Sequence, residues 1–377
     1  MINLELNAGE MSGSSQTLRE IYQQPELWKD TFNIYRETGK EIDEFIKEIK
    51  SKHEKIRIIF TGAGTSEYVG NVLVDYLNSK ENIFESIATT NLVSNPNLYF
   101  DKTATILISF ARSGNSPESL AAVNLADKLV DDIYHIAITC AKEGKLAVKL
   151  QDRENAKVVL MPEKSNDKGF AMTGSFSCML LYALLTFDKN DIETKERYVE
   201  SAVKLGEDVE NRKEEIRDLV NFDFNRIVYL GSGVFYPLTN EARLKILELT
   251  AGEVVTCNES SMGFRHGPKS FINEDTLVVS FVSPDSYTSK YDIDILNEIS
   301  SEKIAKKILA ITTNELDCER FLLENQNIEE IYLVLPYVMV AQLIAIITSL
   351  RIGNTPDTPS KTGTVNRVVK GVIIHEL

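Results

Sequence analysis

The stretch from Thr105 to Leu120, TILISFARSGNSPESL, constrains the fold more than any other part of the chain. It begins with the apolar run 106–108, which is typical of a strand buried on both faces of a sheet. Small hydroxylated residues and glycine follow, and Ser116 and Pro117 then suit the N-cap and first position of a helix. The stretch predicts a strand, a hydroxyl-rich turn and a helix N-terminus.

Such a turn attracts anions, because the first N–H groups of a helix lack partners within the helix and carry the positive end of its dipole. Ser113, Ser116 and Ser119 can add hydroxyl donors. The turn has no P-loop lysine, so the pattern favours a phosphate monoester over a nucleoside triphosphate. The turn chemistry alone leaves open an ordinary strand-to-helix turn capped by serine.

A second unit of this kind lies earlier in the chain, where the apolar run 56–61 precedes GAGTS, residues 62–66. Its spacing is not GxGxxG, so a dinucleotide fingerprint is not supported. Ligands of open α/β sheets bind at the carboxyl ends of the strands. We therefore expect Thr65-Ser66 and the turn 113–116 to converge there, which favours the phosphate interpretation.

Apolar runs and amphipathic segments alternate along the chain and then start again. We expect helices over 14–52, 173–188, 192–219, 237–250 and 336–352, and strands near 56–61, 83–89, 104–109, 133–139, 157–161, 226–230, 253–257, 276–282, 307–312 and 331–335, with a last short strand in the tail 365–377. The alternation predicts parallel sheets covered by helices on both faces. The restart at 226, with GSG at 231–233 in the place of GAGTS, predicts an internal duplication.

The composition of the chain limits the classes of partner that we expect it to bind. The net charge of −15 argues against nucleic acid or an anionic membrane, although a local nest of N–H groups binds phosphate even in an acidic protein. We find no run of about 18 apolar residues and no signal peptide. The cysteines, Cys140, Cys178, Cys257 and Cys318, lack metal-binding spacing and are expected to be reduced core thiols of a cytoplasmic protein.

Two places carry groups suited to acid–base chemistry. His266 lies in the glycine-rich loop GFRHGPK, residues 263–269, and is either an acid–base group or part of a plain surface loop. Glu241 and Glu248 are seven residues apart on one predicted helix, hence on one face. The alternative is a solvated face paired with Arg243 and Lys245.

Four motifs together, GAGTSEYVG, SFARSGNSPES, EARLKILELTAGEVV and GFRHGPKSF, resemble the double SIS (sugar isomerase) domain family. Within it the chain is similar to the AgaS group, described as galactosamine-6-phosphate deaminase/isomerase or tagatose-6-phosphate ketose/aldose isomerase. The resemblance implies an α/β fold of two tandem SIS domains, each a doubly wound parallel sheet flanked by helices. The implied limits are an N-terminal helical segment 1–52, a phosphosugar-binding domain 53–220 and a catalytic domain 221–377.

The resemblance also implies roles for single residues. Glu248 matches the family's catalytic base, Glu241 a second carboxylate near the sugar, and Lys370 a lysine near the reacting end. His266 matches the ring-opening histidine, which relatives supply from the neighbouring subunit. Substrate and phosphate contacts are implied for Gly64, Thr65, Ser66, Arg112, Ser113, Gly114, Asn115, Ser116 and Thr173, although Met172 replaces the serine that relatives carry before Thr173.

The implied reaction converts galactosamine 6-phosphate to tagatose 6-phosphate and ammonia by aldose–ketose proton transfer. It needs neither a metal nor another cofactor. The implied protein is a cytoplasmic homo-oligomer, a dimer or tetramer with shared active sites, that binds neither nucleic acid nor membranes. Three alternatives stay open: a tagatose-6-phosphate isomerase, a fructosamine-phosphate deglycase, and a non-catalytic sugar-phosphate sensor.

Overall fold

The computed structural model describes residues 2–6, 9, 12–81, 83–369 and 371–377. Contacts divide the chain into two units, and each unit combines several separate stretches of the sequence. One, the β1–β5 unit, holds residues 26–167, 174–195 and 365–377, and the other, the β6–β10 unit, holds residues 1–25, 168–173 and 196–364. The predicted limits 1–52, 53–220 and 221–377 each cover one continuous stretch, whereas the contacts group separate stretches. These limits therefore stay a prediction.

The β1–β5 unit contains a parallel five-stranded sheet in the order β2-β1-β3-β4-β5. Its strands are β1 (Ile56–Thr61), β2 (Phe84–Ser86), β3 (Ala104–Ala111), β4 (Ile133–Thr139) and β5 (Ala156–Leu160). Its helices are most of α3 (Gln24–Lys52), α4 (Thr65–Asn78), α5 (Thr89–Ser94), α6 (Pro96–Tyr99), α7 (Pro117–Leu129), α8 (Lys145–Leu150), η1 (Glu163–Ser165) and α9 (Gly174–Phe187). Every residue of β3 is buried, as its apolar run predicts.

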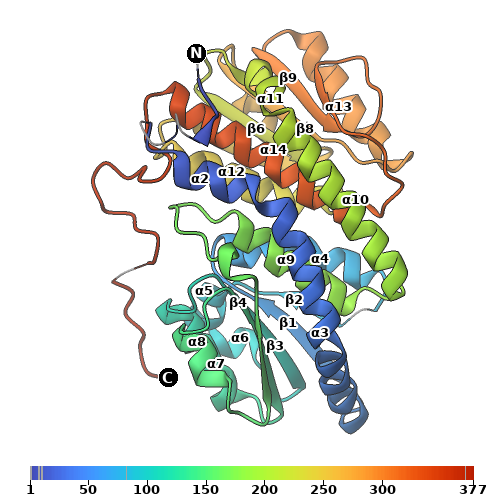
Figure 1. Cartoon of the computed structure of the whole chain (residues 1–377), viewed down its shortest axis with the longest axis vertical. Coiled ribbons are helices and arrows are strands. Elements are labelled where there is room, and N and C mark those ends of the chain that lie inside the picture. Colours follow the sequence, from blue (N-terminus) through green and yellow to red (C-terminus); the bar gives the residue numbers. More distant parts are fainter. Residues whose placement is uncertain (1, 7–8, 10–11, 82, 370) are drawn as a thin grey trace. The chain divides into compact units, whose positions relative to one another are not determined.

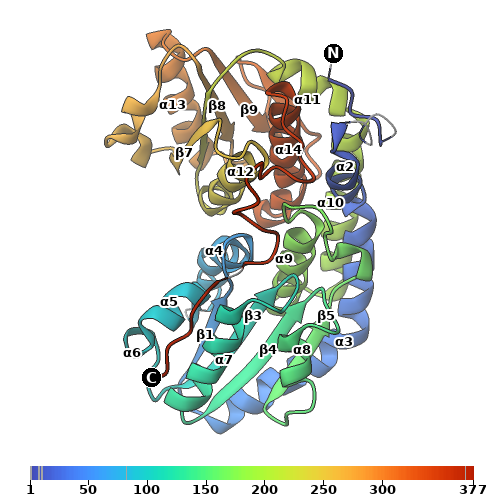
Figure 2. The same cartoon turned by 90° about the vertical axis from the view of Figure 1, so that its left-hand side faces the viewer.

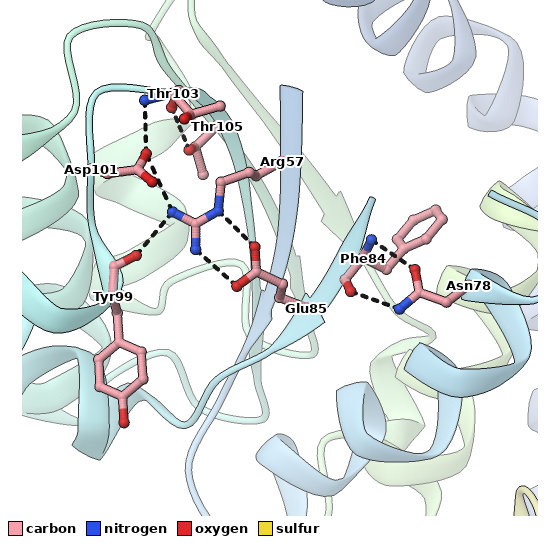
Figure 3. A network of polar contacts seen from close by, with 8 residues as sticks. All are labelled: Arg57, Asn78, Phe84, Glu85, Tyr99, Asp101, Thr103 and Thr105. Carbon is pink, nitrogen blue, oxygen red and sulfur yellow. Dashed lines mark hydrogen bonds and ion pairs between the residues drawn. The ribbon is translucent and has the colours of Figure 1, made fainter. Parts of the chain in front are cut away.

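An arginine fixes the amino-terminal end of this sheet (Figure 3). Arg57 of β1 donates two hydrogen bonds to the carboxylate of Glu85 on β2, at 2.6 and 2.8 Å, and one to the carbonyl of Tyr99 at 2.9 Å. Asp101 lies 3.5 Å from the same guanidinium. Bidentate charged pairs of this kind set geometry as well as energy, so Arg57 holds the three-residue strand β2 against its neighbours.

The β6–β10 unit contains a second parallel sheet, in the order β10-β9-β8-β6-β7. Its strands are β6 (Arg226–Gly231), β7 (Val255–Ser260), β8 (Thr276–Phe281), β9 (Lys307–Thr312) and β10 (Arg320–Leu322). Its helices are α2 (Ser15–Tyr22), most of α10 (Ile192–Asn211), α11 (Lys213–Val220), α12 (Phe235–Leu249), η2 (Gly263–Arg265), η3 (Pro268–Phe271), α13 (Thr288–Glu302) and α14 (Glu330–Arg351). Strands β6, β8 and β9 lie between α13 on one side and α11, α12 and α14 on the other (Figures 1 and 2).

The two sheets have the same strand order when β6–β10 are read against β1–β5. The second and first strands of each repeat pair at one edge, and the third, fourth and fifth follow. This confirms the internal duplication that the restarted sequence pattern predicts, and it confirms two parallel α/β sheets flanked by helices.

The expected strand at 331–335 is wrong. These residues form the start of α14, while the short strand β10 at Arg320–Leu322 was not predicted. A short apolar run does not distinguish a buried strand from a buried helix, and here the run continues into an apolar helix. The resulting 22-residue helix is long and apolar enough to cross a membrane, contrary to our expectation, but its apolar window is completely buried, as in the core helix of a soluble protein.

The C-terminal tail forms no strand over 365–369 and 371–377, which corrects another expectation. Instead it runs along the β1–β5 unit to α7, where Lys128 contacts the carbonyl of Leu377 (Figure 2). Its valines and isoleucines include exposed side chains, so it lacks the apolar cover that would order it as an edge strand.

Candidate active site

Two hydroxyl-rich turns leave neighbouring strands of the β1–β5 unit. Strands β1 and β3 pair in parallel with Thr61 opposite Ser109, so the turns that follow them start at the same edge of the sheet. Gly64, with φ of 57°, begins α4, and the buried residues Thr65 and Ser66 form its first turn. The sheet thus brings together the two turns that the sequence predicts at one edge.

The turn after β3 is fixed by its own contacts. Gly114 has a φ of 62°, and its carbonyl accepts a hydrogen bond from the N–H of Leu146 at 3.0 Å. The side chain of Asn115 accepts another from the N–H of Lys145 at 3.1 Å. Ser116 caps α7 as predicted, since its hydroxyl lies 2.7 Å from that of Ser119 and accepts from the Ser119 N–H. The turn is therefore pre-formed at the positive end of α7.

Arg112 links this turn to the C-terminal tail. Its buried guanidinium donates to the carbonyl of Arg367 at 2.6 Å. The guanidinium of Arg367 in turn contacts the side chain of Asn166, at 3.2 Å, and the carbonyl of Asp167. Lys370, which we expect near the reacting end of the sugar, lies outside the described residues.

Three more hydroxyls of the same unit lie near the carboxyl ends of its strands. Thr61 ends β1, Ser109 lies on β3, and Thr89 begins the helix that follows β2. Each hydroxyl is buried and has no hydrogen-bond partner among the residues that the structure describes. Buried polar groups of this kind mark places where a polar ligand or an ordered water binds. Sequence reasoning missed them, although polar residues at the ends of apolar runs were a signal.

Helix α12 carries a buried ion cluster in the β6–β10 unit. The ammonium of Lys245 lies 2.6 Å from Oε2 of Glu248 and 3.3 Å from Oε1 of Glu241. The side chains of Lys245 and Glu241 are fully buried, whereas that of Glu248 is 24% exposed. The prediction that both carboxylates share a helix face is confirmed. Of the alternative, the pairing with Lys245 is present, but the solvated face is wrong because Glu241 and Lys245 are buried.

Lys245 is the residue that sequence reasoning undervalued. Burial alone lowers the pKa of its ammonium, but the two carboxylates outweigh burial and raise that pKa above its ordinary value. The lysine therefore stays charged at neutral pH and compensates two carboxylates that face one side of the helix. The signal was the spacing itself, because positions 241, 245 and 248 share one helix face.

His266 lies in a loop that its neighbours hold in place. Phe264 is buried in the core beneath the loop, while Arg265 and Lys269 both contact Glu298 of α13, at 2.6 Å for Arg265. The two cations that flank His266 are thus used to anchor the loop. His266 itself is exposed, and within the described chain its ring has no hydrogen-bond partner. A firmly held, exposed imidazole suits an acid–base role toward a ligand or a second chain.

The remaining predicted residue, Thr173, is buried directly before α9, and Met172 beside it is partly exposed. The structure therefore groups the phosphate-turn residues in one unit and Glu241, Glu248 and His266 in the other. In the described ranges, no group of three or more histidine, cysteine, aspartate or glutamate side chains is arranged to hold a metal ion.

The chain is similar to a known family and to known proteins. The family model described as SIS domain matches residues 52–187. A relative from Shewanella sp. (strain ANA-3), named D-galactosamine-6-phosphate deaminase AgaS, is 39% identical over 381 residues, covering 99% of this chain and 95% of the relative. 

Two solved structures match nearly the whole fold. One, from Clostridium novyi NT, is described as a candidate tagatose-6-phosphate ketose/aldose isomerase; it is 45% identical, with both chains covered completely and a TM-score of 0.95. The other, a tagatose-6-phosphate ketose/aldose isomerase from Escherichia coli, is 35% identical over 96% of this chain and 97% of that one, with a TM-score of 0.87. Because this similarity spans both repeats and the motifs of both units, the chain belongs to the SIS-domain family, in its AgaS group.

Proposed function

We propose that this protein is a sugar-phosphate deaminase that converts galactosamine 6-phosphate and water to tagatose 6-phosphate and ammonia. The observation that carries the proposal is the buried cluster of Glu241, Lys245 and Glu248, which gives the chain a positioned carboxylate for proton transfer. The 39% sequence identity with a relative that is named as a deaminase of this substrate supports the choice of sugar.

In the proposed reaction, Glu248 removes the proton from C2 of the open-chain sugar and returns a proton to C1. Loss of the C2 proton gives an enolamine, and protonation at C1 gives a ketimine at C2, which water hydrolyses to the ketose and ammonia. Glu248 suits this role, since it is the partly exposed member of the cluster and Lys245 keeps an ammonium 2.6 Å away. The ammonium also favours the negative charge that develops in the enolamine-forming transition state.

The phosphate of the substrate binds at the two hydroxyl-rich turns, with Ser66, Ser113 and Ser116 as donors. Two helix N-termini start at these turns, and both favour an anion. Arg112 adds a buried positive charge and ties the turn to the tail that carries Lys370. Thr173 completes the proposed contacts to the sugar.

His266 opens the sugar ring in a site completed by a second chain, so the functional protein is at least a homodimer. The exposure of its ring on an anchored loop supports this role. Mixing Glu248→Gln with His266→Asn tests it. Random exchange of subunits should restore about a quarter of wild-type activity, because half of the dimers are mixed and each holds one intact site. A mixture as inactive as its parents would contradict sharing.

We also propose a cytoplasmic location, in keeping with four free cysteines, two of them buried. Disulfides in the protein isolated from its native cells would overturn this.

The decisive experiment measures ammonia released from galactosamine 6-phosphate and from glucosamine 6-phosphate by the purified protein, with the ketose product identified by NMR. Ammonia in equal amount to tagatose 6-phosphate is expected. Glu248→Gln serves as the inactive control, and binding without turnover would indicate a sensor.

A second candidate is a simple isomerase that interconverts tagatose 6-phosphate and galactose 6-phosphate. The names of two solved relatives favour it. Turnover of tagatose 6-phosphate at a higher kcat/KM than that of the amino sugar would make isomerisation the main activity.

A further inference from the structure

We propose that Asp292 is an internal ligand that occupies, in the second repeat, the anion position that binds phosphate in the first, so that the second repeat takes up no phosphosugar. The location of the phosphate in the first repeat rests on the proposed function. The assignment of Asp292 as the internal ligand of the second repeat rests on the hydrogen bonds of its carboxylate.

The turns of the two repeats correspond residue by residue. A β-carbon added to Gly62 would meet the backbone of Ser66, and one added to Gly231 would meet the backbone of Phe235, four residues later in both cases. The third residues, Gly64 and Gly233, have φ of 57° and 54°. The strands β1 and β6 thus end in the same turn.

The neighbouring elements correspond as well. The N–H of Thr89 donates to the carbonyl of Gly62 in the first repeat, and that of Ser261 donates to the carbonyl of Gly231 in the second. Strand β3 with its next residues reads TILISFARSGNSP, and strand β8 reads TLVVSFVSPDSYT. This aligns Arg112 with Ser283, so the loops after β3 and β8 can be compared directly.

Asp292 of α13 fills the centre of the second set of turns. One carboxylate oxygen accepts from the hydroxyl of Ser232, at 2.5 Å, and from that of Ser261. The other oxygen accepts from the N–H of Ser283 at 3.0 Å. These donors follow β6, β7 and β8 respectively, so a fully buried carboxylate lies where three turns meet. Buried charges need such compensation, and here the donors are provided by the anion-binding edge of the repeat.

Two further carboxylates reinforce the negative charge. Oε2 of Glu330 would lie 3.5 Å from a β-carbon at Gly233, so this carboxylate covers the turn after β6. Asp285 caps α13 by accepting from the N–H groups of Tyr287 and Thr288, at 3.0 and 2.8 Å. Burial, helped by Asp292 and Asp285, raises the pKa of Glu330. An incoming phosphate would meet carboxylates at both turns.

The donors that the first repeat offers have also changed in the second. Phe235, buried against Tyr337, replaces the hydroxyl of Ser66, and Pro284 stands at the place of Ser113. Both repeats keep one hydroxyl at corresponding positions, Thr89 in the first and Ser261 in the second. The hydroxyl of Ser261 is bound to Asp292, whereas that of Thr89 is buried and has no partner in the described chain. In the first repeat the hydroxyl of Thr89 thus stays available to an external anion, whereas in the second repeat the matching hydroxyl of Ser261 is satisfied internally.

Titration calorimetry with galactitol 6-phosphate, which has no carbonyl and cannot react, tests the stoichiometry. One ligand per chain is expected in the wild type, and no measurable binding in Ser113→Ala/Ser116→Ala. Two ligands per chain, or binding that survives in the double variant, would overturn the inference. If the wild type binds no sugar phosphate, the proposed function fails, and the following arm then decides the inference alone.

The second arm uses inorganic phosphate and the Ser113→Ala/Ser116→Ala background. Adding Asp292→Ala removes the internal ligand, and phosphate affinity should rise at least about tenfold. Asp292→Asn, which keeps the position filled, is the matched control and should not gain affinity. A folded Asp292→Ala variant without this gain overturns the inference. If that variant does not fold, the wild-type stoichiometry, measured with phosphate where the sugar phosphate does not bind, decides.

Discussion

Replacing Lys245 with methionine should convert a compensated ion cluster into a buried excess of negative charge. The side chain is fully buried between Glu241 and Glu248, with its ammonium 3.3 and 2.6 Å from their oxygens. Methionine fills a similar volume, so the change removes the charge and leaves the packing nearly intact. Glu248 can turn toward solvent, whereas Glu241 stays inside.

Breaking a buried ion pair by removing one partner costs about 3–5 kcal/mol, because the remaining charge loses its compensation. Glu241 should respond by taking up a proton, so its folded pKa rises above the unfolded value of about 4.3. The folded state then binds more protons than the unfolded state. Stability of the variant therefore falls by about 1.4 kcal/mol per pH unit above that value, until the pH passes the folded pKa.

Wild-type protein should behave differently. The pKa of Lys245 is raised in the folded state, so its stabilising contribution is complete below about pH 10.4 and is lost only as the pH rises through the folded pKa. Urea unfolding of both proteins at pH 5.5 and 7.5 measures the contrast. We expect Lys245→Met to lose up to about 2.7 kcal/mol more than the wild type over this interval.

Two variants sharpen the test. Lys245→Met/Glu241→Gln removes the buried charge and should recover both the stability and its flat pH profile. Lys361→Met breaks an exposed pair with Glu253 and should cost no more than about 1 kcal/mol at either pH. A Lys245→Met variant with the same loss at both pH values, or with a loss as small as that control, would refute the assignment of a buried, charged cluster.

The other predictions concern single side chains. Glu248→Gln should lower kcat about 10²–10⁴-fold with little change in KM, and exchange of the C2 proton in D₂O, followed by NMR, should slow as much. His266→Asn should slow the cyclic substrate more than an acyclic analogue with a C2 proton, while its free energy of unfolding stays within about 0.5 kcal/mol because the ring is exposed; equal damage to both substrates would contradict ring opening. Arg57→Lys should cost about 1–3 kcal/mol in urea unfolding, since a lysine cannot keep the bidentate contact with Glu85. Arg112→Ala should release the tail and speed proteolysis after residue 364; unchanged cleavage would show that the tail is held elsewhere.

The sequence predicts strands β1, β3, β4, β6 and β9 well, because each is a largely apolar run that ends in a small or hydroxylated residue. The prediction fails at 331–335, where a run of branched and aromatic residues belongs to a helix that is apolar all round. Period alone could not decide there, since no polar face marks the helix.

The candidate site was predictable where donors and turn are neighbours in the chain, as at Ser113 and Ser116. It was not predictable where burial decides the chemistry. Lys245 reads as an ordinary surface lysine until α12 is packed, and Asp292 lies 60 residues from the hydroxyl of Ser232 that it binds. Contacts of this range depend on the sheet topology, which no local pattern contains.

The amide contact between Gln24 and Gln342, at 2.7 Å, has a consequence for protein synthesis. It joins residues 318 positions apart, one at the start of α3 and the other within the apolar helix α14. A ribosome that adds about 5–20 residues per second needs about 16–64 seconds to span that interval. During this time Gln24 has been synthesised but Gln342, its partner in α14, has not. Residues 26–167 can already assemble their sheet in the same period. Among the described residues, α14 is the one helix that is long and apolar enough to cross a membrane, so chaperones that bind apolar segments should engage it late in translation.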